Sequence, residues 1–519
     1  MESPSSVRPA ARISTTTQCP SLPAELWKII FSVGYYHEED GSFWSHYKPP
    51  DLASICRSCT LFCGLARPML YHEFDSHVLT CINYDDNNEF NRFSIVKFAW
   101  TISTNPLLAS MVRRVNIEGV CDVWDMGMAS GSPVPSKDHP NHPMASILAD
   151  RAAELSVDFS YYEVYTNVHS PQNVGFDLVA LILVQLPMLD TLSLKWSGRP
   201  PVTRMPDPRG AWPWKQSIRN MHLTYSRTSD PTKFRIIGRE RRIPGYCLDP
   251  VIPLFISGTT LTRLTLECSA GPSFVPPLDN LREVIIIDCD FRPGQFLNLL
   301  DTCKSLVKFA GRRFKLSWGS EVMEALEPAS SSLEVLGLRF SGIDFFRGQG
   351  PRIPSFRQFT ALKTFSLDMN CVWDWQVVLN GDTSPNPDTL LTTLLPESIE
   401  EVALLNEGLD NRFRFQFEAH VKRLGLEITL NGRFQHLRRL HGVEFTPIDF
   451  NLQRDINDAL FEGDRDGARE IQNHAARRFA TLNEARNLMI DAGVEFCIDC
   501  PKELECDCEN DPLILGHGI

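Results

Sequence analysis

The chain has 519 residues, with 64 acidic against 51 basic side chains and a formal net charge of −13. This acidic balance excludes a general nucleic-acid binder, because phosphate contacts need a concentrated positive surface. A hydrophobic content of 43% excludes a mostly disordered protein. The length fits two to four ordinary domains, or one small domain followed by a long repeat array.

The first 20 residues are rich in Ser, Thr and Pro and contain no apolar stretch of the secretory-signal kind. They predict a disordered leader, residues 1–20. A helix is expected next, in LPAELWKIIFSV, where Pro23 suits a first helical position and Glu25 complements the helix dipole. Its apolar side chains recur at helical spacing, at Leu22, Leu26, Ile29, Ile30 and Val33.

Two further short helices are expected before residue 75. Asp51 can cap the first, DLASICRSC, whose apolar face holds Leu52, Ile55, Cys56 and Cys59. The second lies in TLFCGLARPMLYHEF, where Pro68 should end or kink the helix. Its apolar positions are Phe62, Leu65, Ala66, Met69 and Leu70. Because about 50 residues bury little surface, the leftover apolar side chains suggest a partner.

The order of these residues in segment 21–75 resembles the F-box, the motif by which substrate receptors join cullin-type ubiquitin ligases through a small adaptor. The residues that carry the resemblance are Leu22, Pro23, Glu25, Leu26, Asp51, Leu52, Cys56, Arg57, Phe62, Leu65, Ala66, Pro68, Leu70 and Tyr71. The segment from Gly34 to Pro50 is longer and more polar than an F-box usually has between its first two helices. The alternative is an ordinary helical subdomain packed on its own chain.

The resemblance implies that the N-terminal helices hold the adaptor and, through it, a cullin. The implied adaptor-binding residues are Leu22, Pro23, Leu26, Ile29, Leu52, Ile55, Phe62, Leu65, Pro68 and Leu70. It also implies that the ligase chemistry belongs to partners, so this chain would need no catalytic residue and no cofactor.

A second pattern, L-x-x-L-x-L, recurs between residues 105 and 445, and it predicts short strands with alternate side chains in a core. Full copies are Val112/Val115/Ile117, Leu189/Leu192/Leu194, Ile218/Met221/Leu223, Leu261/Leu264/Leu266, Leu281/Val284/Ile286, Leu333/Leu336/Leu338, Leu362/Phe365/Leu367 and Ile399/Val402/Leu404. Degenerate copies are Leu306/Phe309 and Leu437/Leu440. From Leu261 to Leu362 the copies are spaced by the 20–29 residues of leucine-rich repeats.

Region 105–445 therefore resembles an irregular leucine-rich-repeat solenoid, with the expected Cys or Asn after the core strand at Cys289 and Asn370. A helix is expected from Val174 to Gln185, and the long spacer Gly119 to Gln172 is expected to be loop. The resemblance implies that residues flanking the core leucines bind a target protein. Examples are Lys195, Glu267, Arg339 and Asp368.

Segment 446–495 has a helical texture and is expected to be a C-terminal cap that covers the last repeat. Its apolar positions are Ala459, Leu460, Ala468, Ile471, Ala475, Phe479, Leu482, Leu488 and Met489. The tail 496–519 is acidic and carries Cys497, Cys500, Cys506 and Cys508. We expect a mobile tail there rather than a zinc site, because the second pair is too close together and the acids repel thiolates.

No phosphate loop, dinucleotide fingerprint, H-E-x-x-H or G-x-S-x-G motif occurs, and the 13 histidines are dispersed. The 15 cysteines are an odd number and scattered, which fits reduced thiols in the cytoplasm or nucleus. No apolar stretch is long enough for a membrane span.

The overall prediction is an α/β protein: a three-helix F-box, an irregular leucine-rich-repeat solenoid and a helical cap. Its expected function is to recognise a target for a ubiquitin ligase. Two alternatives stay open, a leucine-rich-repeat scaffold unconnected to ubiquitin and an enzyme whose residues converge only in space.

Overall fold

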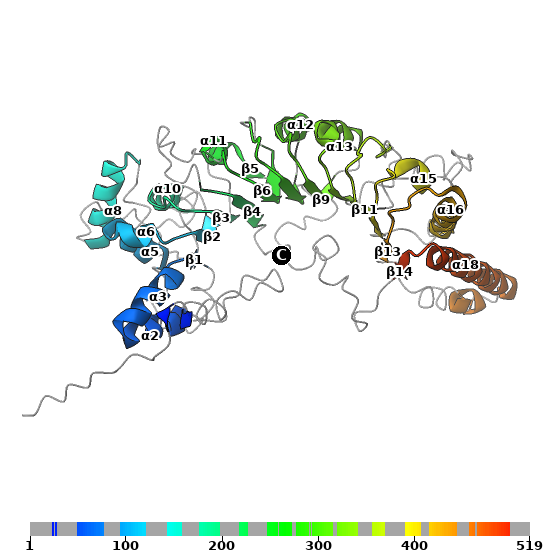
Figure 1. Cartoon of the computed structure of the whole chain (residues 1–519), viewed down its shortest axis with the longest axis horizontal. Coiled ribbons are helices and arrows are strands. Elements are labelled where there is room, and N and C mark those ends of the chain that lie inside the picture. Colours follow the sequence, from blue (N-terminus) through cyan, green and yellow to red (C-terminus); the bar gives the residue numbers. More distant parts are fainter. Residues whose placement is uncertain are drawn as a thin grey trace, which may run out of the picture. The chain divides into compact units, whose positions relative to one another are not determined.

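The computed structural model describes residues 23–24, 26–27, 49–76, 94–120, 143–157, 176–197, 217–226, 246–257, 259–271, 277–289, 291, 293–314, 319–340, 355–368, 390–405, 415–443, 456–461 and 464–498. The chain divides into two compact units, Met1–Glu73 and Phe74–Ile519. It combines helices with one large sheet, so the expected α/β class is confirmed (Figure 1).

The first unit contains α2 (Pro49–Ser58) and α3 (Thr60–Leu70). α2 already begins at Pro49, whose missing N–H costs nothing in a first turn, so the expectation that Asp51 caps this helix is wrong. Cys59 does not extend α2 either. It caps α3, because its Sγ accepts a hydrogen bond from the Phe62 N–H at 3.4 Å. Pro68 lies inside α3, which continues to Leu70.

The second unit is organised around a sheet with the strand order β1-β2-β3-β4-β6-β8-β9-β10-β11-β12-β13-β14. All neighbours from β2 to β14 are parallel. The strands are β1 (Glu73–Asp75), β2 (Arg114–Val120), β3 (Thr191–Ser197), β4 (Asn220–Ser226), β6 (Arg263–Glu267), β8 (Glu283–Ile287), β9 (Lys308–Phe314), β10 (Val335–Phe340), β11 (Thr364–Asp368), β12 (Glu401–Leu405), β13 (Arg439–Val443) and β14 (Glu495–Ile498). Each new strand is thus added beside the previous one.

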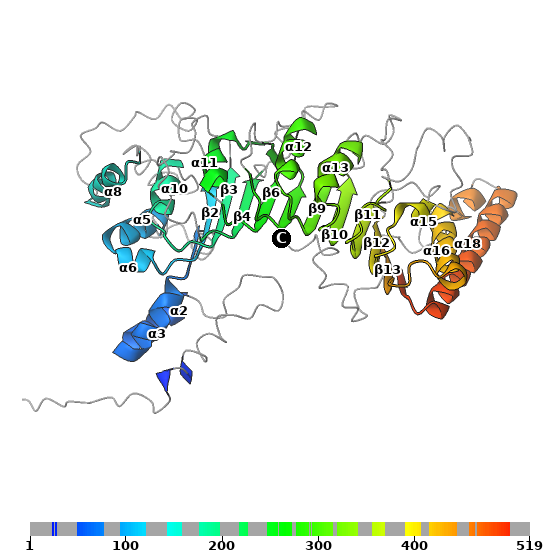
Figure 2. The same ribbon diagram turned by 45° about the horizontal axis from the view of Figure 1, so that its top comes forward.

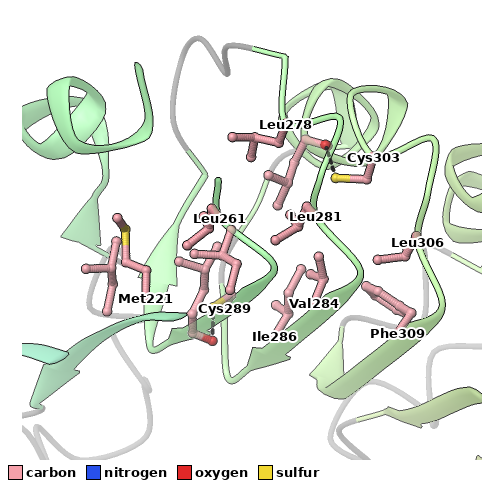
Figure 3. Close-up of a cluster of buried hydrophobic side chains, with 14 of the residues drawn as sticks. Met221, Leu261, Leu278, Leu281, Val284, Ile286, Cys289, Cys303, Leu306 and Phe309 are labelled. Atoms are coloured by element: carbon pink, nitrogen blue, oxygen red, sulfur yellow. Dashed lines mark hydrogen bonds between the residues drawn. The ribbon is translucent and has the colours of Figure 1, made fainter. Parts of the chain in front are cut away.

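The register of the sheet places equivalent core residues in continuous rows. The middle residue of every predicted copy of the pattern falls in one row, and each of these side chains is at most 2% exposed. The row is Val115, Leu192, Met221, Leu264, Val284, Phe309, Leu336, Phe365, Val402 and Leu440. Figure 3 shows several of these side chains directed to the same side of neighbouring strands. The predicted strands are therefore confirmed.

Helices lie along one side of this sheet (Figures 1 and 2), namely α10 (Phe176–Leu183), α11 (Ile252–Ser257), α12 (Pro293–Asp301), α13 (Gly319–Leu326), α15 (Leu390–Leu394) and α16 (Phe415–Asn431). The helix expected near 174–185 is α10, and its side chains from Leu178 to Leu183 are at most 1% exposed. Aromatic contacts fix the packing of α12, since the rings of Phe296 and Phe309 meet edge to face at 5.9 Å.

A repeated backbone bend follows β6 and β8. Cys268 and Asp288 occupy equivalent positions and both adopt left-handed φ angles, 52° and 54°. After the second bend Cys289 is buried, and its Sγ lies 3.4 Å from the Leu266 carbonyl and 3.3 Å from the Ile287 carbonyl. Burial raises the pKa of Cys289 to about 12, so the thiol keeps its proton and can donate to these carbonyls. Asn370 lies outside the described residues.

Several of the described helices were not named in the sequence analysis. α5 (Ser94–Thr104) and α6 (Pro106–Ala109) precede β2, and α8 (Pro143–Glu154) lies in the spacer expected to be loop. The expectation of a loop is wrong for α8, which has a buried face formed by Leu148 and Ala152. This face is difficult to recognise in the sequence because many of the residues around it are small.

The C-terminal part differs from the expected cap. α18 (Arg465–Asp491) is one long helix, capped by Asp464, but strand β14 follows it and pairs with β13. The expected boundary at residue 495 is therefore wrong, because the sheet continues to Ile498. Ala468 and Met489 are buried as expected, whereas Leu460 is 50% exposed.

Candidate functional site

The side of the sheet opposite the core carries the polar residues that alternate with the buried rows. In the row just before the middle core residue, charges of opposite sign lie on adjacent strands. Arg263 Nε is 2.5 Å from Glu283 Oε2, and Lys308 Nζ is 2.9 Å from Glu283 Oε1. Partial burial would raise the pKa of Glu283, but the hydrogen bond and charge of Lys308, together with Arg263, hold it below its usual value.

The same row continues with charges at the C-terminal end of the sheet. The guanidinium of Arg439 on β13 lies between two carboxylates, 3.5 Å from Glu401 on β12 and 3.3 Å from Glu495 on β14. These pairs are partly exposed, so they contribute little stability, but they give the outer face a fixed pattern of charge.

Two predicted target-binding residues come together on strands β3 and β6. Lys195 and Glu267 both align with Thr224 of the intervening strand β4. Thr224 Oγ1 donates to Glu267 Oε2 at 3.3 Å, and the His222 Nε2 lies 2.7 Å from the same hydroxyl and 3.8 Å from that carboxylate. We call Lys195, His222, Thr224 and Glu267 the outer-face cluster.

The electrostatics of this cluster favour an ionised Glu267. The neighbouring His222 imidazole has the largest effect that lowers the pKa of Glu267, and the hydrogen bond from Thr224 and the charge of Lys195 act in the same direction, against the opposing effect of burial. A carboxylate held in this way can accept a hydrogen bond or pair with a cation of a bound protein.

The outer-face cluster does not have the geometry of a hydrolase triad. In such a triad the imidazole contacts the hydroxyl with one nitrogen and the acid with the other. Here the same atom, Nε2 of His222, faces both Thr224 and Glu267. The arrangement therefore suits binding rather than activation of the hydroxyl.

The remaining predicted target-binding residues, Arg339 and Asp368, lie on β10 and β11, and their side chains are outside the described part. Sequence reasoning missed His222 and Thr224. The signal was available, because His222 is the residue between the last two core positions and Thr224 aligns with the predicted Lys195.

The N-terminal helices show where the predicted adaptor-binding residues lie. Leu52 is buried between α2 and α3, whereas Ile55, Phe62, Leu65 and Leu70 are only half-buried and Pro23 and Pro68 are exposed. Leu26 is 44% exposed, and the Trp27 ring packs edge to face on Phe62 at 4.8 Å. Leu22 and Ile29 lie outside the described residues. Among the described residues of this unit, Leu26 is thus a large apolar side chain that is exposed, and four others are only partly covered.

No protein-family model and no curated protein matches the sequence of this chain. Within the described ranges, no helix has both the length and the apolar character of a membrane span.

The cysteines of the tail are only partly described. Cys497 lies on β14, in register with His441, and Cys500, Cys506 and Cys508 lie outside the described residues. In the part of the chain that the structure describes, no three His, Cys, Asp or Glu side chains are arranged to hold a metal ion.

An open groove of about 550 Å³ lies where strands β10 to β13 begin. Its walls carry paired charges, since Lys363 Nζ is 2.9 Å from Glu334 Oε2 and Arg433 Nε is 3.7 Å from Glu397 Oε1. The groove therefore presents a second polar surface at one edge of the sheet. Other lining residues are Thr360, Ala361, Ser398, Glu400, Gly432, Phe434, Gln435 and His436.

Proposed function

We propose that this chain is an F-box protein of the leucine-rich-repeat kind, a non-catalytic target receptor of a Skp/cullin/F-box type ubiquitin ligase in the cytoplasm or nucleus. The observation that carries the proposal is the in-register row of core residues from Val115 to Leu440, one per parallel strand. In the sequence this array follows an N-terminal unit that has the residue order of an F-box. A one-strand repeat with helices on one side is the arrangement that leucine-rich repeats adopt.

The N-terminal unit is the proposed adaptor-binding part. Leu52 and Ala66 of this unit are buried, whereas Phe62 is half-buried and Leu26 is exposed. Apolar surface of this kind gains free energy when a partner covers it, about 25 cal/mol per Å².

The second unit is the proposed target-binding part, with the outer-face cluster as its centre. Its charges are already paired, and a target must therefore offer complementary groups in the right places to compete with these pairs. Such an arrangement supports selectivity more than affinity. Neither unit needs a cofactor for these roles.

The proposal is tested at Leu26. Replacing Leu26 by Asp removes exposed apolar surface and places a carboxylate where the adaptor would exclude water. We expect the Kd for the purified adaptor to rise at least about 100-fold. Binding is measured by calorimetry on the full chain, and circular dichroism checks that the variant is folded.

Leu107→Asp is the matched control, because Leu107 is an exposed leucine on α6 of the second unit, 61% exposed. This control should bind the adaptor like the wild type. If wild type and Leu26→Asp bind equally, or if neither binds, the ubiquitin-ligase function is wrong and the leucine-rich-repeat scaffold becomes the better account.

A further inference from the structure

The open groove where β10 to β13 begin is lined by more carboxylates than permanently charged cations. The charged residues that line it are Glu334, Glu397 and Glu400 and, of opposite sign, Lys363 and Arg433. The imidazole of His436 also lines the groove, and it adds a positive charge only when it is protonated. A volume of about 550 Å³ is within the range of ligand sites in proteins, so the groove has room for a bound group.

The guanidinium of Arg433 is held by groups of its own chain. Its Nη2 donates to the Thr392 carbonyl at 3.0 Å, its Nη1 lies 3.6 Å from Glu427 Oε2, and its Cζ lies 4.8 Å from the centre of the Phe434 ring. Glu427 is buried on α16 and also pairs with Arg423 at 2.7 Å. Including Glu427 and Arg423 leaves the excess of one carboxylate unchanged. Arg433 is thus engaged, and it is poorly suited to bind an external anion.

The ammonium of Lys363 is shared between two carboxylates on either side of it. Backbone hydrogen bonds join Lys363 to Glu334 at 2.8 Å and to Glu400 at 2.7 Å, so the three residues lie side by side where β10, β11 and β12 begin. Lys363 Nζ is 2.9 Å from Glu334 Oε2, and the side chain of Glu397 is 76% exposed and 3.7 Å from Arg433 Nε. Because a carboxylate can accept several hydrogen bonds, Glu397 and Glu400 keep capacity for a further cation.

We propose that this groove binds a basic segment of a partner protein, whose Lys or Arg side chains pair with Glu397 and Glu400. The cations of the groove are already engaged, and its charge therefore complements a cationic ligand. One wall has a fixed shape, since Gly432 and Phe434 adopt left-handed φ angles of 64° and 55° and Phe434 is buried. A preformed wall reduces the entropy cost of binding. This inference goes beyond the proposed function and does not depend on a ubiquitin-ligase adaptor.

The proposal is tested on the full chain with a fluorescein-labelled peptide of three lysines flanked by glycines, and with the corresponding glutamate peptide. Fluorescence anisotropy at low salt measures both Kd values. We expect the lysine peptide to bind more tightly than the glutamate peptide, and its Kd to rise about tenfold when Glu397→Gln and Glu400→Gln are combined. Carbodiimide coupling of the lysine peptide, followed by mass spectrometry, should place the new amide bonds at carboxylates of the groove.

The matched control combines Glu154→Gln with Glu484→Gln, which removes the same amount of charge from exposed positions on α8 and α18. It should change the Kd of the lysine peptide by less than about twofold. Circular dichroism checks that both double variants are folded. Equal weakening in the two double variants would show general attraction to an acidic chain and overturns the proposal. Absence of lysine-peptide binding, tighter binding of the glutamate peptide, or coupling only outside the groove overturns it as well.

Discussion

Leu336 illustrates how each core residue depends on its neighbours along the array. It has no exposed surface, and its register partners are Phe309 on one adjacent strand and Phe365 on the other. In a repeat structure a strand is covered only by the units beside it and by its own helix. A cavity at this position therefore cannot be filled from elsewhere in the fold.

We expect Leu336→Ala to lower the free energy of unfolding by about 2–5 kcal/mol, because the site loses transfer energy and keeps a cavity. Val335→Ala is the control on the same strand. Val335 is half-buried in the outer row between Lys308 and Thr364, so its truncation should cost less than about 1 kcal/mol. Urea unfolding of both variants measures the difference. Equal losses would show that the inner and outer rows are wrongly assigned.

At the scale of elements, the last helix and strand close the sheet together. α18 packs on α16 closely enough that a Cβ at Gly425 would lie 2.9 Å from the Cβ of Leu488, and Lys422 pairs with Glu484 at 2.8 Å. β14 then pairs with β13, which would otherwise present an open edge. Helix α18 and strand β14 thus both cover this end of the sheet.

We expect a chain that ends at Val494, and so lacks the four-residue strand β14, to lose about 2–4 kcal/mol of stability and to aggregate on warming. A chain that ends at Asp499 keeps β14 but lacks Cys500, Cys506 and Cys508, and it should unfold like the full protein. Thermal unfolding with light scattering compares the two. A large loss of stability in the chain that ends at Asp499 would mean that the cysteine tail has a structural role.

The positions of the strands could be predicted from the sequence, whereas the helices in the segments between them could not, and the reason is physical. The strand residues Leu264, Val284 and Leu336 must fill one continuous core, so their spacing is fixed by the repeat. The spacers need only reach the next strand, and α5, α8 and α18 therefore follow no common pattern. β14 was missed because its edge position requires only the half-buried Phe496 in the core row.

Some residues of the candidate site could likewise be predicted from the strand pattern, whereas the contacts between them could not. Lys195 and Glu267 could be predicted to lie on the outer face because each directly follows the last core leucine of its strand. The hydrogen bond from Thr224 on β4 to Glu267 on β6 depends on side-chain directions across different strands. Spacing along the chain does not contain that information.

At the scale of the whole molecule, the two units present side chains of different chemistry. The N-terminal unit has exposed apolar side chains, whereas the outer face of the second unit has paired charges. A target receptor needs two such independent surfaces, because loss of the target must leave the ligase contact intact. A simple scaffold has no such requirement.

Our last prediction separates the two surfaces by affinity purification from the protein's own cells. Leu26→Asp should lose adaptor and cullin but keep the target proteins, which should accumulate because they are no longer modified. Glu267→Lys places a second cation beside Lys195 and removes the acceptor of Thr224, so it should lose the targets and keep the adaptor. Glu484→Lys, which disrupts an ion pair on α18, is the matched control and should keep both. Loss of the same proteins in Leu26→Asp and Glu267→Lys would show that the two units do not act as separate binding parts.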